Sequence, residues 1–416
     1  DFFSDKSLIV ITSLLLLFLF ISVSSNSQNQ SLSLNSGYSN QSFYSLSNGE
    51  VQNTLNNNWD LAFSTDIFSS SIRINDGKGT QLYNYHLGDT NSWNSINSST
   101  PNILTSPIYN SDTSWDVGAF NVFETGGFDY SWGVYNLQSH HVIGDSLYVI
   151  QTINGNWKKL WIKSKESGEY FIQYADLDGS NLVSTSIAAS NYSDKRFVYY
   201  SLDQSLVIDR EPSLDSWDIS FTKYITDVQG IPYPVTGVLS NVGIDIAKAT
   251  NISNPYSYID YDIHPFDNKI NSMGYDWKSF SGSGYVLDNQ RCYFIRDYQD
   301  NIWRLIFEVF EGTSSGNIEF NIEAISTNVS INHEKVKTFQ FFPNPARDRI
   351  NVIYEINIDA SLTIYDLNGR LVFEKNLEKS QFLVSDISIN HLESGIYIIS
   401  MYSEGNEIYN DKLIIN

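Results

Sequence analysis

The sequence has very little cysteine. Cys292 is the only one among 416 residues, which excludes a disulfide within the chain. Its neighbours in NQRCYFIRDY alternate between polar and apolar residues as they do in a strand, so we expect a buried and inert thiol. Exported proteins that lack disulfides must obtain their stability from the packing of secondary structure, and we expect sheets to supply it here.

Amphipathic helical periodicity is also missing once the first 25 residues are passed. Aromatic residues make up 14% of the chain, with 27 Tyr and 24 Phe. Tyr, Phe, Thr, Ile and Val favour pleated surfaces, whereas the abundant Asn, Ser, Asp and Gly favour turns. The composition therefore predicts an all-β protein, and its length predicts two or three domains.

Basic residues are scarce, with 25 Lys and Arg against 47 Asp and Glu. A net charge of −22 argues against a nucleic-acid partner, which requires clustered cations. One explanation of this charge is solubility in a saline medium. The alternative is calcium-binding loops such as DLDGSN at 176–181, although that loop lacks a third acidic position and a distant bidentate Glu, which favours a plain hairpin turn.

Catalytic motifs are absent from the sequence. There is no G-x-S-x-G elbow and no H-E-x-x-H, and Cys292 has no base beside it in a known motif. Asp209 and Glu211 resemble a glycosidase pair in spacing, but they flank Arg210 between two β segments, which is typical of a charged connector. The sequence therefore predicts a protein that is not an enzyme, without a metal site.

The N-terminal residues predict export. An apolar run of about sixteen residues from Leu8 to Val23 follows Lys6 and precedes small polar residues. This run is short for a membrane-spanning helix and suits a signal peptide, which we place at residues 1–27. No other stretch is long enough to cross a bilayer, so no transmembrane segment is expected after cleavage. Because the chain opens on Asp1 rather than Met, we expect its start to lie upstream.

One short phrase occurs twice, as NNWDLAFST around Trp59 and as DSWDISFTK around Trp217. Alternation predicts that Trp59, Leu61 and Phe63 share one face of a strand, and that Asp60 lies on the other. The same pattern repeats with Trp217, Ile219 and Phe221 against Asp218. We expect the two tryptophans to lie at the centres of two separate cores, so the phrase indicates a structural repeat.

The repeat extends beyond this phrase. FYSLSNG at Phe43 matches YYSLDQS at Tyr199, and two Tyr-containing hairpins begin near Asp145 and Asn289. The chain is therefore expected to hold two tandem, homologous, aromatic-rich β units at residues 36–192 and 195–325. Residues 326–337 read as a linker, and residues 338–416 as a small C-terminal β-sandwich.

The C-terminal segment resembles the type A sorting domain of the type IX secretion system of Bacteroidetes. The resemblance rests on Phe342-Pro343-Asn344-Pro345, Leu362–Asp366 before the turn at Gly369, then Gly395 and Tyr397, and finally Lys412. It implies export by the signal peptide followed by passage through the outer membrane, with the secretion machinery as partner. The expected location is the cell surface or the medium.

The two upstream units resemble the HmuY-like haem-binding family of the same phylum. The residues that match are Trp59–Phe63, then Ile72-Arg73-Ile74-Asn75 and the loop with Gly77 and Gly79. The second copy keeps Trp217–Phe221 and lacks the Arg-x-Asn element. The resemblance implies an all-β fold that binds one haem through two axial His or Met side chains.

Axial haem ligation requires two donors that face each other across an apolar slot. Outside the linker and the C-terminal domain, five side chains qualify: His86, His140, His141, His264 and Met273. Because adjacent strand residues point to opposite faces, we expect at most one of His140 and His141 to face a given slot. For each His an ordinary surface or turn position is the alternative.

Three functions remain for the two units. The first is binding of haem or another small, flat, apolar ligand, with no other cofactor. The second is a structural or adhesive role at the cell surface. The third is a secreted hydrolase, which no motif supports.

Overall fold

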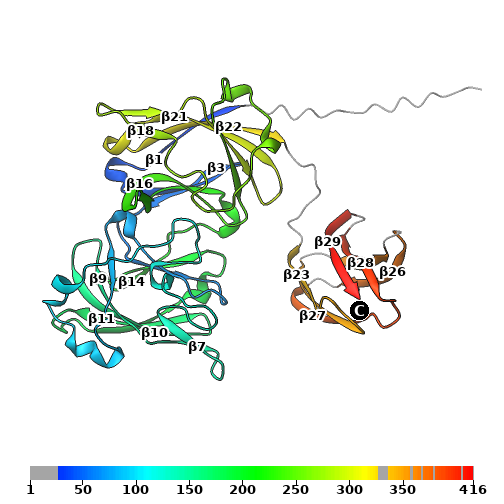
Figure 1. The fold of residues 1–416 in the computed structure, drawn as a ribbon, viewed down its shortest axis with the longest axis horizontal. Helices are drawn as coiled ribbons and strands as arrows, with labels where there is room; N and C mark the ends of the chain where they lie inside the picture. The colour runs from blue at the N-terminus through cyan, green and yellow to red at the C-terminus, as the bar shows by residue number, and fades with distance from the viewer. Residues whose placement is uncertain are drawn as a thin grey trace, which may run out of the picture. The chain divides into compact units, whose positions relative to one another are not determined.

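The computed structural model describes residues 27–326, 336–356, 359–366, 369–377, 380–403 and 406–415. All but the last residue of the predicted signal peptide and most of the predicted linker lie outside these ranges. Two compact units are present: one covers residues up to 295 together with 302–325, and the other covers 296–301 and 326–416. The larger unit contains two β-sandwiches, and the described residues are almost entirely strands and turns (Figure 1). The all-β prediction is confirmed.

The first sandwich has a seven-stranded sheet facing a four-stranded sheet. The larger sheet consists of β6 (Gln81–Asn84), β7 (Gly133–Asn136), β8 (His141–Gly144), β9 (Leu147–Gln151), β10 (Trp157–Glu166), β11 (Glu169–Asp176) and β12 (Val183–Ala188). The smaller sheet consists of β4 (Leu61–Ser64), β5 (Ile72–Ile74), β13 (Phe197–Ser201) and β14 (Leu206–Ile208). Alternating apolar side chains of both sheets, including Leu61, Phe63 and Tyr170, form its core.

The second sandwich has a five-stranded sheet facing another four-stranded sheet. The first of these contains β1 (Gln28–Ser33), β17 (Asp245–Ala249), β20 (Cys292–Arg296), β21 (Ile302–Phe310) and β22 (Asn317–Ser326). The other contains β2 (Asn40–Ser45), β3 (Gly49–Leu55), β15 (Ile219–Val228) and β16 (Ile231–Ser240), and a separate hairpin is formed by β18 (Lys278–Phe280) and β19 (Tyr285–Leu287). Its core includes Tyr44, Phe221 and Phe320.

Each four-stranded sheet contains strands from both predicted units. β2 pairs with β15, which brings Tyr44 opposite Ile219. β13 pairs with β4, which brings Tyr200 opposite Leu61. The strand pairing therefore crosses the boundary predicted between residues 192 and 195. The β2–β3 hairpin of the first predicted unit joins the second sandwich, and the β13–β14 hairpin of the second predicted unit joins the first sandwich.

The C-terminal unit is a smaller sandwich of three and four strands. Its strands are β23 (Val336–Phe342), β24 (Arg349–Ile356), β25 (Ala360–Asp366), β26 (Leu371–Leu377), β27 (Ser380–Ser388), β28 (Gly395–Ser403) and β29 (Asn406–Ile415). The side chain of Asn344 donates to the Lys412 carbonyl at 2.7 Å and accepts from the Ile414 N–H at 2.9 Å. The opening motif of this domain is therefore joined to its last strand.

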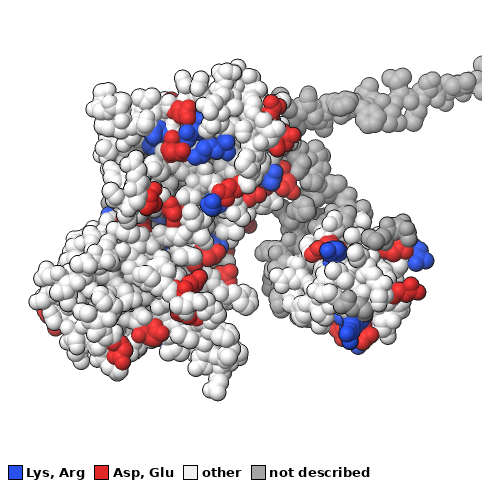
Figure 2. Space-filling model, in the orientation of Figure 1, with Lys and Arg blue, Asp and Glu red and all other residues white. Residues whose placement is uncertain are grey.

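The only helices among the described residues are short 3₁₀ turns. These are η1 (Ser36–Tyr38), η2 (Asp76–Lys78), η3 (Thr90–Ser95), η4 (Thr100–Ile103), η5 (Ala119–Asn121), η6 (Ala189–Tyr192), η7 (Leu214–Ser216), η8 (Pro255–Ser257), η9 (Tyr261–Ile263) and η10 (Gly312–Ser314). Within the described ranges, no helix has the length and apolar character needed to span a bilayer. Acidic side chains are scattered over the visible faces of the sandwiches rather than gathered in one patch (Figure 2).

Candidate functional site

The repeated Trp-Asp phrase makes the same contacts in both sandwiches. The Asp60 carboxylate accepts from the backbone N–H of Leu202 at 2.8 Å, and the Asp218 carboxylate accepts from that of Leu46 at 2.7 Å. Both aspartates are almost fully buried, and each holds the turn that follows the strand paired with its own phrase. These matched contacts support the proposal that the two sandwiches are copies of one unit.

An asparagine accompanies each phrase. The Asn75 amide donates to the carbonyl of Trp59 at 3.1 Å, and the Asn241 amide donates to that of Trp217 at 2.7 Å. The second copy therefore has the asparagine that the sequence comparison did not find, although Leu239 stands two residues before it, where the first copy has Arg73. A search for the Arg-x-Asn pattern misses this match, because only the asparagine has the same structural role in both copies.

The two tryptophans lie outside the main cores, contrary to the prediction. Leu61 and Phe63 point into the first core, whereas Trp59 packs with Ala62 and Tyr199 on the opposite face of the sheet. The regular strand begins only at Leu61, so strict alternation does not extend back to Trp59. Trp217 likewise packs edge-on against Phe43, with ring centroids 5.0 Å apart. Both tryptophans line one cavity between the two sandwiches.

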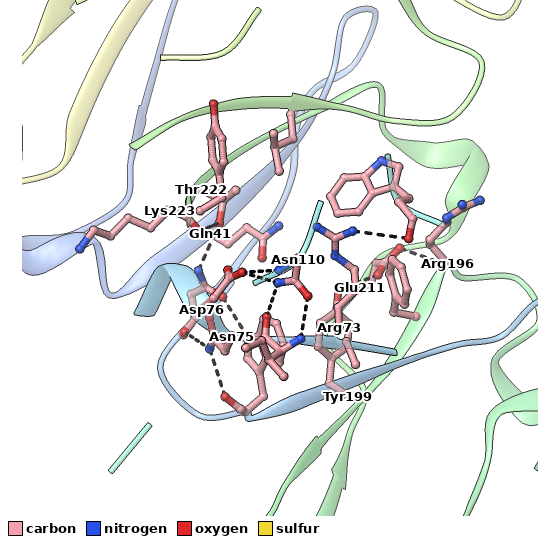
Figure 3. A pocket seen from close by; sticks show the side chains of 18 of the residues that line it. Gln41, Arg73, Asn75, Asp76, Asn110, Arg196, Tyr199, Glu211, Thr222 and Lys223 are labelled. Atoms are coloured by element: carbon pink, nitrogen blue, oxygen red, sulfur yellow. Dashed lines mark hydrogen bonds between the residues drawn. The ribbon is translucent and has the colours of Figure 1, made fainter. Parts of the chain in front are cut away.

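We call this space the junction cavity (Figure 3). Polar side chains converge on it from both sandwiches, and Arg73, Asp76 and Glu211 are all buried there. Its volume is about 60 Å³. This is enough for a few water molecules and is far below the volume of small-molecule sites.

The buried charged side chains at the junction form hydrogen bonds mainly with backbone carbonyls and backbone N–H groups. The Arg73 guanidinium donates to the carbonyls of Ser111 and Ser114, both at 2.8 Å, and burial lowers its pKa to about 10. Asp76 accepts from the Asn110 backbone N–H at 2.9 Å, and burial raises its pKa to about 6. Gly77 leaves space for β15, because a Cβ there would lie 2.2 Å from the Lys223 carbonyl oxygen. The junction is a packed and specific contact.

The connector between the sandwiches contains the predicted acidic pair. Glu211 accepts from the Tyr199 hydroxyl at 2.7 Å and from the Arg196 backbone N–H at 3.1 Å. Asp209 forms an ion pair with Lys195 instead. Arg210, which is buried between them, donates to Gln41 of β2 at 2.9 Å and to the Leu55 carbonyl of β3. The pair is therefore part of the connector, and its carboxylates do not face each other across a substrate site.

The Glu211 carboxyl makes stability depend on pH. Burial raises its pKa from 4.5 to about 7. Between these values the folded protein retains a proton that the unfolded chain has released, so this contribution is fully present below pH 4.5 and lost as pH rises through 7. Between pH 5 and pH 8 the wild type should lose about 2–3 kcal/mol of unfolding free energy relative to Glu211→Gln, which keeps the acceptor for Arg196. Chemical denaturation at pH 5 and pH 8 measures this; parallel pH profiles for the two proteins would contradict it.

A larger surface cleft lies over the β7–β8 hairpin of the first sandwich, and we call it the histidine cleft. Its volume is about 520 Å³, which is within the range of small-molecule sites. The lining residues are Ile67, Phe68, Ser70, Gly127, Phe128, Tyr130, Tyr135, Ser139, His140, His141, Val142, Lys165, Ser167 and Gly168. It combines exposed aromatic rings with two imidazoles and several hydroxyls.

Tyr135 and His140 form a hydrogen-bonded pair in this cleft. The Tyr135 hydroxyl lies 2.8 Å from His140 Nδ1, and the ring of Phe128 stacks on Tyr135 with centroids 5.8 Å apart. His140 has φ of 59°, at the end of the loop that joins β7 to β8. This left-handed residue breaks the alternation, so both His140 and His141 line one cleft. The expectation that only one of them would face a given slot is wrong.

The cleft has a fixed wall and an acidic edge. Lys165 is buried, and its ammonium donates to the carbonyls of Asp66 and Ser69, which anchors the loop that displays Phe68. Burial lowers the pKa of Lys165 to about 8. His141 Nδ1 lies 3.8 Å from a carboxylate oxygen of Glu166. The two imidazoles and the Tyr135 phenol are side-chain types that serve as general acids and bases in enzymes.

The other predicted haem ligands lie in separate places. His86 lines a different surface pocket of about 360 Å³ with Tyr83 and Phe123. His264 is on the second sandwich, where its Nε2 lies 2.8 Å from the Tyr258 hydroxyl. Met273 is fully buried in the core of that sandwich. Of the five candidates, only His140 and His141 share a pocket.

Two smaller predictions concern Cys292 and the acidic loop. Cys292 is buried, and burial raises the pKa of its thiol to about 11, as expected of an inert cysteine. Asp176 starts a turn between β11 and β12, where it accepts from Asn181 at 2.6 Å and pairs with Lys158 at 2.9 Å. In the described part of the chain, no group of three or more His, Cys, Asp or Glu residues is arranged to hold a metal ion.

Comparison with known proteins identifies the C-terminal unit. Residues 340–416 match the family described as the secretion system C-terminal sorting domain. The prediction for this segment is confirmed, and the protein is secreted or displayed at the cell surface. The sorting domain also makes the secretion machinery a partner of this chain.

The chain is also similar to the ulvan lyase NLR42 of Nonlabens ulvanivorans. The two are 25% identical over 260 residues, which is 61% of this chain and 40% of the relative. The match therefore spans less than half the length of that enzyme. A solved polysaccharide lyase aligns with 87% of this chain and 40% of its own, at 8% identity and a TM-score of 0.15, and at that score the likeness carries no inference.

These findings correct the predicted function. Neither match is to a haem-binding protein, the HmuY-like resemblance has no support, and the relative is named as an enzyme. The predictions of haem binding and of a protein without catalytic activity are therefore wrong. They relied on a phrase whose residues are structural, whereas the Tyr135–His140 pair is formed across a hairpin and belongs to no sequence motif.

Proposed function

We propose that the protein is a secreted polysaccharide lyase that acts on an acidic polysaccharide of the ulvan type. The observation that carries this proposal is the 260-residue similarity to an ulvan lyase. The sorting domain supports it, because polymers too large to enter the cell must be cut outside. We place the reaction in the histidine cleft, a surface site where groups capable of proton transfer lie together.

A lyase cleaves the chain at a uronic acid by β-elimination. A base removes the proton on C5, next to the carboxylate, and that electron pair forms the double bond between C4 and C5. The C4–O bond breaks, and the departing oxygen takes up a proton. The site must therefore supply a base, an acid and a group that stabilises the carboxylate as its negative charge grows.

The cleft has candidates for each role. The Tyr135 hydroxyl can exchange a proton with His140 at 2.8 Å, which suits an acid–base pair. His141 lines the same cleft and, when protonated, supplies positive charge toward the uronate. Phe68 and Phe128 are 84% and 51% exposed, so their rings are available to pack against the apolar faces of sugar rings.

Incubation of the secreted protein with ulvan tests this proposal. We expect shortened chains and a rise in ultraviolet absorbance, because elimination leaves a conjugated C4–C5 double bond. A neutral glucan, which has no carboxylate to acidify C5, is the matched control and should not be cleaved. Chain shortening without new absorbance would indicate hydrolysis, and no shortening of any acidic polysaccharide would refute the proposal.

A further inference from the structure

The second sandwich has an aromatic surface on the hairpin β18–β19. These two strands pair only with each other in the described structure. Phe280 is 65% exposed and Tyr285 is 40% exposed, and their ring centroids lie 5.4 Å apart at 63°. We call these two rings the aromatic platform. Large rings held together at the surface mark a contact for a ligand more often than an isolated apolar residue does.

The platform is held firmly from below. The Tyr285 ring packs edge-on against Phe310, with centroids 4.7 Å apart. Gly312 makes this approach possible, because a Cβ there would lie 2.9 Å from the Tyr285 ring. Lys278 donates to the Thr236 carbonyl at 2.6 Å and so ties the base of the hairpin to β16. Rings fixed in this way lose little conformational freedom when a ligand binds.

The base of the hairpin carries basic side chains in a chain of net charge −22. Asp276 and Asp288, at the two ends of the hairpin, are ion-paired with Arg291 at 3.0 and 2.9 Å, and Lys248 contacts Asp276 at 2.9 Å. Charged side chains of both signs gather on the visible face of the second sandwich, near the β18 and β21 labels of Figure 1, and basic ones are prominent there (Figure 2). Because cations match the acids, this patch repels a polyanion less than the rest of the surface does.

The corresponding hairpin of the first sandwich borders the histidine cleft. Trp132 and Trp277 are both fully buried and stand directly before β7 and β18. The first hairpin carries Tyr135, His140 and His141, whereas the second carries Phe280 and Tyr285. The second therefore has aromatic surface without an imidazole, which suits binding without catalysis.

We propose that the aromatic platform is a second binding surface for an acidic polysaccharide chain, separate from the histidine cleft. This inference rests on the proposed function for the class of ligand. Pyranose C–H faces pack on the rings of Phe280 and Tyr285, above a hairpin base where Lys248 and Arg291 neutralise Asp276 and Asp288. A polymer bound at two places on one protein gains affinity because the second contact is intramolecular.

The test measures binding of ulvan to the full secreted protein by affinity electrophoresis. Phe280→Ala combined with Tyr285→Ala should weaken binding about tenfold. Tyr233→Ala is the matched control, since Tyr233 is an aromatic residue 56% exposed on β16 of the same sandwich. The double variant should also raise KM for long chains and leave turnover of short oligosaccharides unchanged.

The outcomes separate this inference from the proposed function. Platform-dependent binding of ulvan without any cleavage would refute the lyase activity and leave the platform intact. Cleavage with unchanged binding in the double variant would refute the platform and leave the lyase. Loss of a dimer in the double variant, with binding of ulvan unchanged, would show instead that the platform contacts a second copy of the chain, and would also overturn the proposal.

Discussion

Replacement of Tyr135 by Phe is expected to lower the rate of ulvan cleavage by about 10²–10⁴-fold, the usual contribution of one acid–base group. The phenyl ring keeps its stacking against Phe128, 5.8 Å between centroids, and loses only the hydroxyl that lies 2.8 Å from His140. The variant should therefore fold normally. Initial rates at saturating ulvan, followed by ultraviolet absorbance, measure the loss.

Replacement of His140, the hydrogen-bond partner of the Tyr135 hydroxyl, should lower the rate of ulvan cleavage in the same way. His140→Asn is the preferred variant, because asparagine tolerates the left-handed backbone at φ of 59° better than alanine does. Tyr83→Phe and His86→Ala, in the separate pocket of the same sandwich, are the matched controls and should keep full activity. If Tyr135→Phe and His140→Asn also keep full activity, the cleft is not the active site.

The second large effect is on stability. Asp60→Ala is expected to lower the free energy of unfolding by about 3 kcal/mol, because it leaves one buried and one partly buried backbone donor without acceptors. Those donors are the N–H groups of Ile153 and Leu202, at 2.9 and 2.8 Å from the carboxylate oxygens. Guanidinium unfolding followed by tryptophan fluorescence measures the change.

Two comparisons sharpen this result. Asp218→Ala should also destabilise the protein, because its carboxylate accepts from the Leu46 N–H at 2.7 Å in the second sandwich. Asp145→Ala removes an exposed carboxylate and should change stability by less than about 0.5 kcal/mol. If Asp60→Ala matches Asp145→Ala, the phrase does not have the structural role assigned to it.

Local patterns predicted the local structure well. Alternation placed Leu61 and Phe63 in a core, and the turn composition of 176–181 indicated a hairpin turn. The same rule failed at Trp59, because regular strand geometry begins two residues later. It also failed at His140, whose left-handed backbone brings it beside His141 in one cleft.

The candidate site was beyond the reach of sequence patterns. Tyr135 and His140 are ordinary residues of a hairpin and its loop, and only the folding of β7 onto β8 sets the hydroxyl 2.8 Å from the imidazole. Of the five expected haem ligands, four are histidines and one is a methionine, and only His140 and His141 line the same pocket. Chemistry at a surface cleft depends on distances between side chains, which composition does not encode.

The sequence by itself determined that this chain is all-β, has no disulfide and is directed to secretion by its last 77 residues. Alternation, the cysteine count and a short motif are enough for these conclusions, because none of them depends on which strands pair. Only the tertiary structure shows which contacts the residues of the repeated Trp-Asp phrase make. Pairing of β2 with β15 and of β4 with β13 exchanges the leading hairpins of the two predicted units. That exchange places Trp59 and Trp217 at one junction. The paired strands are more than a hundred residues apart in the sequence, so tertiary packing and not a local pattern determines which strands pair.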